Sequence, residues 1–116
     1  MERKTIVQKI GVSENEAIKI AKKYYTLLSA MSSKGLSQMK IDLLSFTAVK
    51  GNISYSTNRE EFCKMYSTSQ ASMYNTIWEL KKMGLLIKDG GKTKVAPKYL
   101  LDFNNNIILQ ISLLHG

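Results

Sequence analysis

The sequence predicts a single α+β domain that is mainly helical, and three observations support this class. Helix-capping residues precede stretches in which apolar residues recur every three or four positions. A short Asp-Gly-Gly segment lies between two extended runs, which is typical of a β-hairpin. The length of 116 residues suits one domain with one hydrophobic core.

The first helix is predicted over residues 14 to 31. Ser13 and Glu16 can form a capping box, because each side chain is placed to bond the backbone N–H of the other residue. Apolar residues then recur at helical spacing, and they are Ala17, Ala21, Tyr24, Tyr25, Leu28 and Met31. The segment before the cap, residues 3 to 10, fits either a short strand or a basic arm.

A second helix is predicted from residue 36 to about residue 50, after a break at residues 32 to 35. Its apolar residues cover much of its circumference, so we expect it at the centre of the fold. Gly51 can adopt the left-handed conformation that ends a helix. The sequence NISYS, residues 52 to 56, alternates apolar and polar side chains and predicts a very short strand.

Two shorter helices follow, separated by the polar break STS. The first is predicted over residues 58 to 66, with Thr57 as its cap and Glu60 three residues later. The second spans about residues 70 to 83, because the Ser69 hydroxyl can accept a backbone N–H of the first turn. The predicted buried stripe of this second helix consists of Met73, Ile77 and Leu80.

The chain is then expected to form a hairpin. Gly84 can take the left-handed position that ends the preceding helix, and LLIK and TKVAP flank the glycine turn DGGK. Glycine tolerates the positive dihedral angles of compact turns, so this order predicts strand, turn and strand. The apolar run at residues 107 to 114 predicts a further, C-terminal strand.

The order helix, short strand, helix, tight turn, helix and hairpin is accompanied by a specific residue pattern. Phe62 is followed by the small Cys63, Tyr66 closes the helix on the core, Ser69 caps the next helix, and MGLL leads into the hairpin. These residues resemble the winged helix-turn-helix family of DNA-binding domains. Ser67 departs from the family, because many members carry glycine at this turn position.

The resemblance covers residues 36 to 96 and implies how the single domain is organised. The expected fold is a winged helix-turn-helix with an extra N-terminal helix and a C-terminal strand. Residues 1 to 35 form an N-terminal arm and helix of the kind that often serves dimerisation in the family. Residues 97 to 116 form a C-terminal extension, and the tail VAPKYLLDFNNN looks somewhat like the ending of winged-helix replication initiators of plasmids and phages.

The helix at residues 70 to 83 carries a polar and mostly uncharged face near its start. With Met73 and Ile77 turned inward, the outward side chains are those of Gln70, Ala71, Ser72, Tyr74 and Asn75. In such a domain this face enters the major groove, where amides can pair bidentately with adenine and a methyl group can touch thymine. The pattern therefore favours base reading over a face that is polar only for solubility.

The chain is strongly basic, with a formal net charge of +8, which indicates an anionic partner such as nucleic acid or a membrane surface, or serves solubility alone. Lysine residues around the hairpin are expected to contact DNA phosphates, or else to protect an exposed hairpin edge from aggregation. The predicted DNA-binding residues are Ser69, Gln70, Ala71, Ser72, Tyr74, Asn75, Lys81, Lys82, Lys88, Lys92 and Lys94.

Two further groups of residues allow two interpretations each. Tyr74 and Trp78 share a helix face, which fits either a stacking platform for single-stranded bases or packing against the wing or a partner subunit, and packing is favoured. Lys19, Lys22 and Lys23 fit either contacts with flanking DNA or a solvated helix face, and the solvated face is favoured.

No enzyme chemistry, cofactor or metal is predicted. The sequence has no glycine-rich phosphate loop, and one cysteine and one histidine cannot assemble a zinc site. Cys63 is expected to pack inertly, and His115 is interpreted as a surface group. The sequence also has no apolar run of membrane-spanning length and no signal-peptide pattern, so we expect a cytoplasmic protein with no membrane partner.

The sequence thus leads to one main functional hypothesis and two alternatives. The main hypothesis is a homodimeric, sequence-specific double-stranded DNA-binding protein that regulates transcription, with helix 70 to 83 in the major groove and wing 88 to 94 on the backbone. The first alternative is a DNA-binding domain for plasmid or phage replication initiation. The second is a winged-helix module that binds protein and not DNA.

Overall fold

The protein is described by a computed structural model that covers residues 13 to 32 and 35 to 100. These residues form an α+β fold that is mainly helical, as predicted. Its elements are α2 (Glu14–Ser32), α3 (Gln38–Lys50), α4 (Ser56–Met65), α5 (Gln70–Lys82), β1 (Leu86–Asp89), β2 (Lys92–Val95) and the 3-10 helix η1 (Pro97–Tyr99). The predicted segments at residues 3 to 10 and 107 to 114 lie outside the described residues.

The predicted capping box opens α2. The backbone N–H of Glu16 donates to the Ser13 hydroxyl at 3.2 Å, and the Ser13 N–H donates to the Glu16 carboxylate at 3.4 Å. The buried face of α2 packs on α3 and includes Ala17, Ile18, Ala21 and Tyr25. The assignment of Met31 to this stripe is wrong, because Met31 lies about a third of a turn around the helix from the buried Tyr25 and is 71% exposed.

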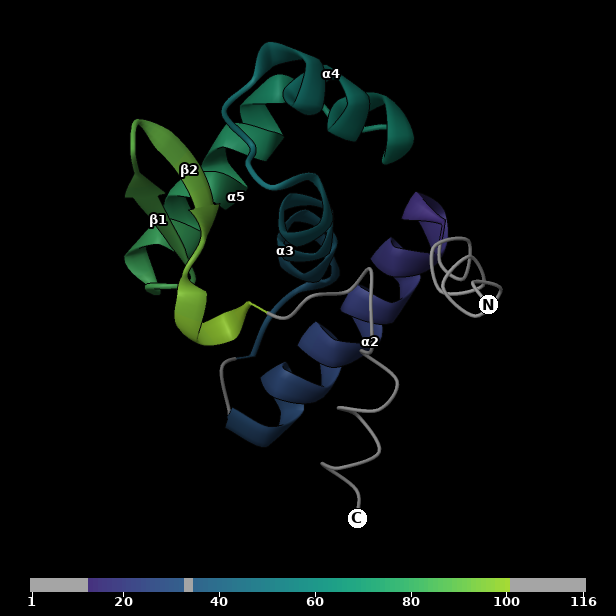
Figure 1. Cartoon of the computed structure of the whole chain (residues 1–116), viewed down its shortest axis with the longest axis vertical. Helices are drawn as coiled ribbons and strands as arrows, with labels where there is room; N and C mark the ends of the chain where they lie inside the picture. Colours follow the sequence, from purple (N-terminus) through teal and green to yellow (C-terminus); the bar gives the residue numbers. More distant parts are fainter. Residues whose placement is uncertain (1–12, 33–34, 101–116) are drawn as a thin grey trace, which may run out of the picture.

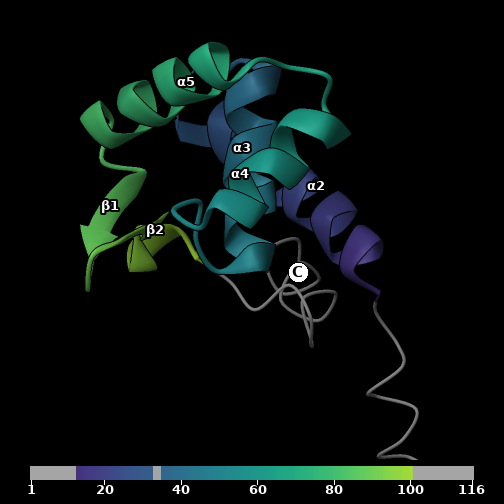
Figure 2. The same ribbon diagram turned by 90° about the horizontal axis from the view of Figure 1, so that it is seen from above.

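Helix α3 is the centre of the fold, as predicted. Every residue from Ile41 to Thr47 is buried. Helix α2 lies on one side of α3, and α5 and the hairpin lie on the other (Figure 1 and Figure 2). The helix begins at the Ser37 cap, whose hydroxyl accepts the Lys40 N–H, and it ends at Gly51 with a φ of 98°.

The strand predicted at residues 52 to 56 is wrong. The Asn52 side chain accepts the N–H groups of Ser54 and Tyr55 at 2.9 and 3.0 Å, and this folds the segment into a turn. One residue still pairs with the hairpin, because the Ile53 N–H donates to the Thr93 carbonyl at 3.0 Å. The Thr93 N–H in turn donates to the Ser54 hydroxyl at 2.6 Å. The loop is therefore fastened to β2 without forming a ladder.

The predicted cap of α4 is also wrong. The helix begins at Ser56, two residues earlier than expected, and its cap residue Tyr55 makes no side-chain capping bond. The turn around Asn52 brings the backbone into helical conformation before Thr57, so Thr57 lies in the first turn and not ahead of it. Glu60 consequently has no capping partner in Thr57.

The turn between α4 and α5 contains Ser67 in a backbone conformation that residues with a side chain rarely adopt. Ser67 has a φ of 51°, the left-handed conformation that glycine adopts without strain. The Thr68 N–H donates to the Cys63 carbonyl at 3.0 Å, which closes this turn. The Ser69 hydroxyl then accepts the Ser72 N–H at 3.1 Å, so the predicted cap of α5 is confirmed.

Strands β1 and β2 form the predicted antiparallel hairpin. Gly90 and Gly91 occupy its turn with φ of 63° and 80°. Leu86 lies opposite Val95, and both side chains are buried against the helices. Gly84 also has a positive φ where α5 gives way to the hairpin, as expected. None of the helices among residues 13 to 32 and 35 to 100 has the length and apolar character that crossing a membrane requires.

Candidate nucleic-acid interface

Helix α5 presents its polar residues to the surface. Met73, Ile77 and Leu80 are buried as predicted, and Thr76 is buried with them. The Thr76 hydroxyl donates to the Ser72 carbonyl at 2.9 Å, so it is satisfied inside the helix. The side chains predicted to read bases are all exposed, and they are Gln70, Ala71, Ser72, Tyr74 and Asn75.

The middle of this exposed face contains a residue that the sequence interpretation assigned to packing. At 3.6 residues per turn, Ala71, Asn75, Trp78 and Lys82 follow one line along α5. The Trp78 side chain is 58% exposed, and the Lys82 ammonium lies 4.4 Å from the centre of its ring. In the described part of the chain, the hairpin therefore leaves more than half of the Trp78 side chain in solvent. Its spacing from Ala71 and Asn75 was the signal that placed it on this face.

Two residues before and within α4 extend the surface. Tyr55 is 50% exposed, and the Lys92 ammonium from β2 lies 5.0 Å from its ring centre. The Arg59 guanidinium donates to the Ser54 carbonyl and lies 5.8 Å from the centre of the Tyr74 ring. Neither Tyr55 nor Arg59 was predicted, because nothing in the sequence order brings the start of α4 beside the middle of α5.

The hairpin lysines do not form one row. Lys88 lies opposite Thr93 in the register, so its side chain leaves the hairpin on one face, and Lys92 and Lys94 leave it on the other. Lys88 is exposed. The Lys94 ammonium is 3.7 Å from the Asp89 carboxylate, so this lysine is partly neutralised by its own hairpin. Lys88 and Lys92 are therefore the better placed of the three to meet a phosphate.

The lysines at the end of α5 point into solvent. Lys81 and Lys82 are both exposed, and cations here favour the negative end of the helix dipole. One turn before Lys82, Glu79 of α5 pairs with Lys40 of α3 at 3.4 Å. The polar flank facing α3 is thus used to hold the helix, and the line from Ala71 to Lys82 is left for other contacts.

On α2, the structure separates three lysines that were interpreted together. Lys19 and Lys23 are exposed, as expected for a solvated face. The Lys22 ammonium instead lies 3.4 Å from the Asp42 carboxylate and 4.7 Å from the centre of the Tyr66 ring. Burial acts to lower the pKa of Lys22, but its hydrogen bond to Tyr66 and the charge of Asp42 outweigh burial and raise that pKa. Lys22 therefore ties α2 to α3 and to the end of α4.

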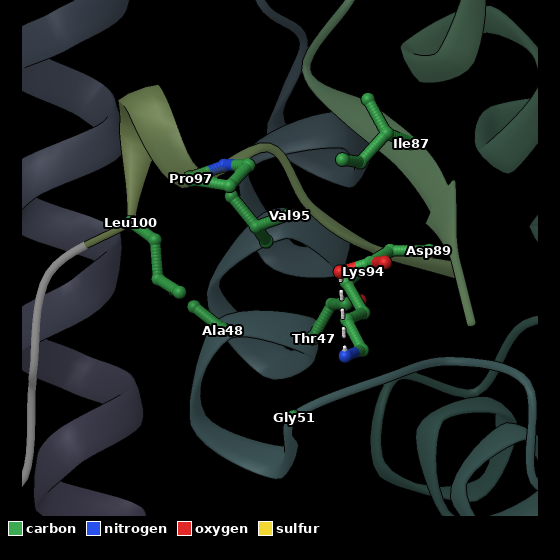
Figure 3. A pocket seen from close by; sticks show the side chains of 9 residues that line it. All are labelled: Thr47, Ala48, Gly51, Ile87, Asp89, Lys94, Val95, Pro97 and Leu100. Carbon is green, nitrogen blue, oxygen red and sulfur yellow. Dashed lines mark ion pairs between the residues drawn. The ribbon is translucent and has the colours of Figure 1, made fainter. Parts of the chain in front are cut away.

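A small pocket lies between the end of α3 and the hairpin, as Figure 3 shows. Its volume is about 180 Å³, and the paired Asp89 and Lys94 side chains lie on one wall. The Thr47 hydroxyl, from the end of α3, is buried with no hydrogen-bond partner among the described residues. Apolar side chains complete the lining: Ala48, Ile87, Val95, Pro97 and Leu100.

The described part of the chain contains Cys63 and several acidic side chains. No group of three histidine, cysteine or acidic side chains is arranged there to hold a metal ion. Cys63 is half-buried rather than fully buried, and its sulfur lies 3.9 Å from the Met73 sulfur.

The chain matches no family model, no curated protein and no solved structure.

Proposed function

We propose that this protein binds double-stranded DNA in a sequence-specific manner and regulates transcription. The observation that carries this proposal is the exposed start of α5, where Gln70, Ser72 and Asn75 stand on a helix whose other side is anchored by Met73, Ile77 and Leu80. Short amide and hydroxyl groups at the start of a helix suit the donors and acceptors of base edges in the major groove.

The arrangement of elements supports a winged helix-turn-helix as the carrier of this function. Helices α3, α4 and α5 precede the β1–β2 hairpin, and Phe62 of α4 and Met73 of α5 share one core. The bond from Ile53 to Thr93 lies where a third, short strand would complete the sheet of such a domain. In this layout α5 is the recognition helix and the hairpin is the wing.

The charge distribution supports DNA as the partner. The formal net charge is +8, Lys88 and Lys92 stand on the hairpin, and α5 begins at the Ser69 cap. Such a helix start attracts phosphate, and lysine contacts with phosphate set affinity and register without choosing sequence. The proposed division is therefore base reading by α5 and backbone binding by the hairpin.

Selection of bound duplexes from a random-sequence library tests the proposal. Enrichment of one motif by the purified protein is the expected result, because the amide groups of α5 distinguish base edges. Binding of duplexes without any enrichment would leave only a nonspecific basic protein. No duplex binding at low salt would favour a protein-binding module instead, for which the exposed rings of Tyr74 and Trp78 are the specific support.

The wing contact has its own expected result. Replacing Lys88 and Lys92 together by alanine should weaken binding to every duplex and flatten the slope of log affinity against log salt by about one to two units, since each neutralised phosphate contributes about 0.9. The slope is measured by fluorescence anisotropy at several salt concentrations. Lys94→Ala is the matched control, and a smaller change is expected because Asp89 already pairs with Lys94. An unchanged slope in the double variant would remove the hairpin from the interface.

We also propose that the protein acts as a homodimer through α2. The outer face of this helix carries an open, mainly apolar groove lined by Lys22, Lys23, Thr26, Leu27 and Ala30. Met31 lies one turn beyond Leu27 and is exposed. Light scattering on a sizing column is expected to give the mass of two chains, and Leu27→Glu with Met31→Glu is expected to give one, because buried carboxylates are costly. Asn15→Glu, at the far end of α2, should keep the dimer. A wild-type monomer would refute it.

A further inference from the structure

Three exposed aromatic rings on the proposed DNA-binding side each have a cation close to them. Lys92 lies 5.0 Å from the ring centre of Tyr55, Arg59 lies 5.8 Å from that of Tyr74, and Lys82 lies 4.4 Å from that of Trp78. The three rings are about half exposed, at 50%, 46% and 58%. Large aromatic side chains left this open form a surface that suits a partner with flat apolar groups.

Contacts along the chain join the three pairs into one series. Arg59 bonds through its guanidinium to the Ser54 carbonyl and through its backbone N–H to the Tyr55 carbonyl, so it links Tyr55 to Tyr74. Tyr74 and Trp78 then follow each other by one turn of α5. The series runs from the hairpin along the exposed face of α5, next to Asn75. We call these six residues the ring series: Tyr55, Arg59, Tyr74, Trp78, Lys82 and Lys92.

The alternation of ring and cation matches one kind of ligand closely. An unpaired nucleotide offers a flat base, which stacks on an aromatic ring, and a phosphate, which a neighbouring cation neutralises. Bases inside an intact duplex are stacked on each other and cannot offer their faces. An apolar protein partner would use the rings but would gain nothing from Lys82, Arg59 and Lys92, so the charges of the series favour nucleic acid.

We propose that the ring series binds unpaired bases at the border of the duplex held by α5, so that the preferred ligand is DNA with a junction between double and single strand. This inference rests on the proposed function, because Asn75 and Trp78 lie one turn apart on the same line of α5. The groove contact is made by the first half of the exposed face. Trp78 stacks on the first unpaired base beyond it.

The single tryptophan of the chain makes this stacking directly measurable. Trp78 is the only tryptophan, so its emission, excited where tyrosine does not absorb, reports one site. Three ligands with the same duplex sequence are compared: a blunt duplex, the duplex with an unpaired tail, and the tail strand alone. The tailed duplex is expected to quench Trp78 emission strongly and to bind about tenfold more tightly than the blunt duplex, the gain typical of one stacked base.

Variants at Trp78 then separate stacking from charge. Trp78→Leu should remove the preference for the tailed duplex, since leucine cannot stack on a base. Trp78→Phe should keep most of the preference. Met65→Leu, which alters a partly exposed apolar side chain on α4, is the matched control and should keep all of it. Circular dichroism confirms that each variant is folded, and labelled DNA replaces tryptophan emission as the signal.

The outcomes of this test distinguish the inference from the function on which it rests. Equal affinity for tailed and blunt duplexes with unchanged Trp78 emission would overturn the junction proposal and leave duplex recognition by Asn75 standing. Loss of blunt-duplex affinity equal to the loss on the tailed ligand in Trp78→Leu would also overturn it, because the ring would then serve the duplex. Absence of binding to all three ligands would overturn both proposals.

Discussion

Phe46→Ala is expected to lower the free energy of unfolding by about 3 to 5 kcal/mol, the usual loss when a buried phenylalanine is truncated. Phe46 has no exposed surface, and its ring meets the Phe62 ring edge to face at 5.4 Å. The side chain thus joins central helix α3 to α4, and through the shared core to Met73 of α5. Alanine would leave a cavity where these three helices meet. Urea unfolding followed by circular dichroism measures the loss.

Two control variants show whether packing causes this effect. Phe46→Leu should cost less than Phe46→Ala, because leucine refills part of the cavity. Lys64→Ala, which shortens an exposed side chain on α4, should change the free energy of unfolding by less than about 0.5 kcal/mol. A loss below about 1 kcal/mol for Phe46→Ala, no more than the average substitution causes, would contradict the central place of α3.

Asn75→Ala and Gln70→Ala are each expected to weaken binding to a selected duplex by about 1 to 3 kcal/mol, the range for one lost bidentate base contact. Affinity for duplexes of random sequence should hardly change, because amides without charge contribute little to phosphate binding. Both residues are exposed on α5, so neither change removes a core contact. Anisotropy titrations of the two DNAs at one salt concentration measure the difference.

The same titrations identify a wrong assignment. Asn15→Ala removes an equally exposed amide from α2 and should bind both DNAs as the unchanged protein does. If Asn75→Ala lowered the affinity for both DNAs equally, the amide would be a general contact and not a reader of bases. That result would remove the main support for sequence-specific recognition.

Local sequence signals predicted most of the helical fold correctly. Ser13 with Glu16, Ser69 and Gly51 act within a few residues of their own positions, so their capping roles follow from the sequence alone. The glycine pair at residues 90 and 91 likewise carries the positive φ that its turn requires. These features need no knowledge of distant parts of the chain.

Signals that depend on neighbouring elements were less informative. The alternation at residues 52 to 56 suggested a strand, but the Asn52 side chain bonds the following N–H groups and turns the backbone instead. Met31 continued the spacing of the apolar stripe, yet its side chain is 71% exposed. A periodic pattern states which face a residue occupies and not whether anything packs against it.

In the candidate site, too, features set by local geometry were predicted, and contacts between distant residues were not. The outward direction of Asn75 follows from helical geometry once Met73 and Ile77 are buried, and it was predicted. The pairing of Lys94 with Asp89 depends on the hairpin register, and the approach of Arg59 to Tyr74 depends on how α4 crosses α5. Neither contact has a signature in the order of residues.

The two hydrogen bonds that fasten Thr93 to the loop ahead of α4 limit how the protein can adapt to its ligand. Through the Ile53 N–H and the Ser54 hydroxyl, the hairpin is secured to the helical body, so its tip cannot swing away from α5 as a free arm would. In the proposed DNA complex, any adjustment needed to touch groove and backbone at once would then come from the double helix. Easily kinked pyrimidine–purine steps between the two points of contact would accordingly be favoured without being touched.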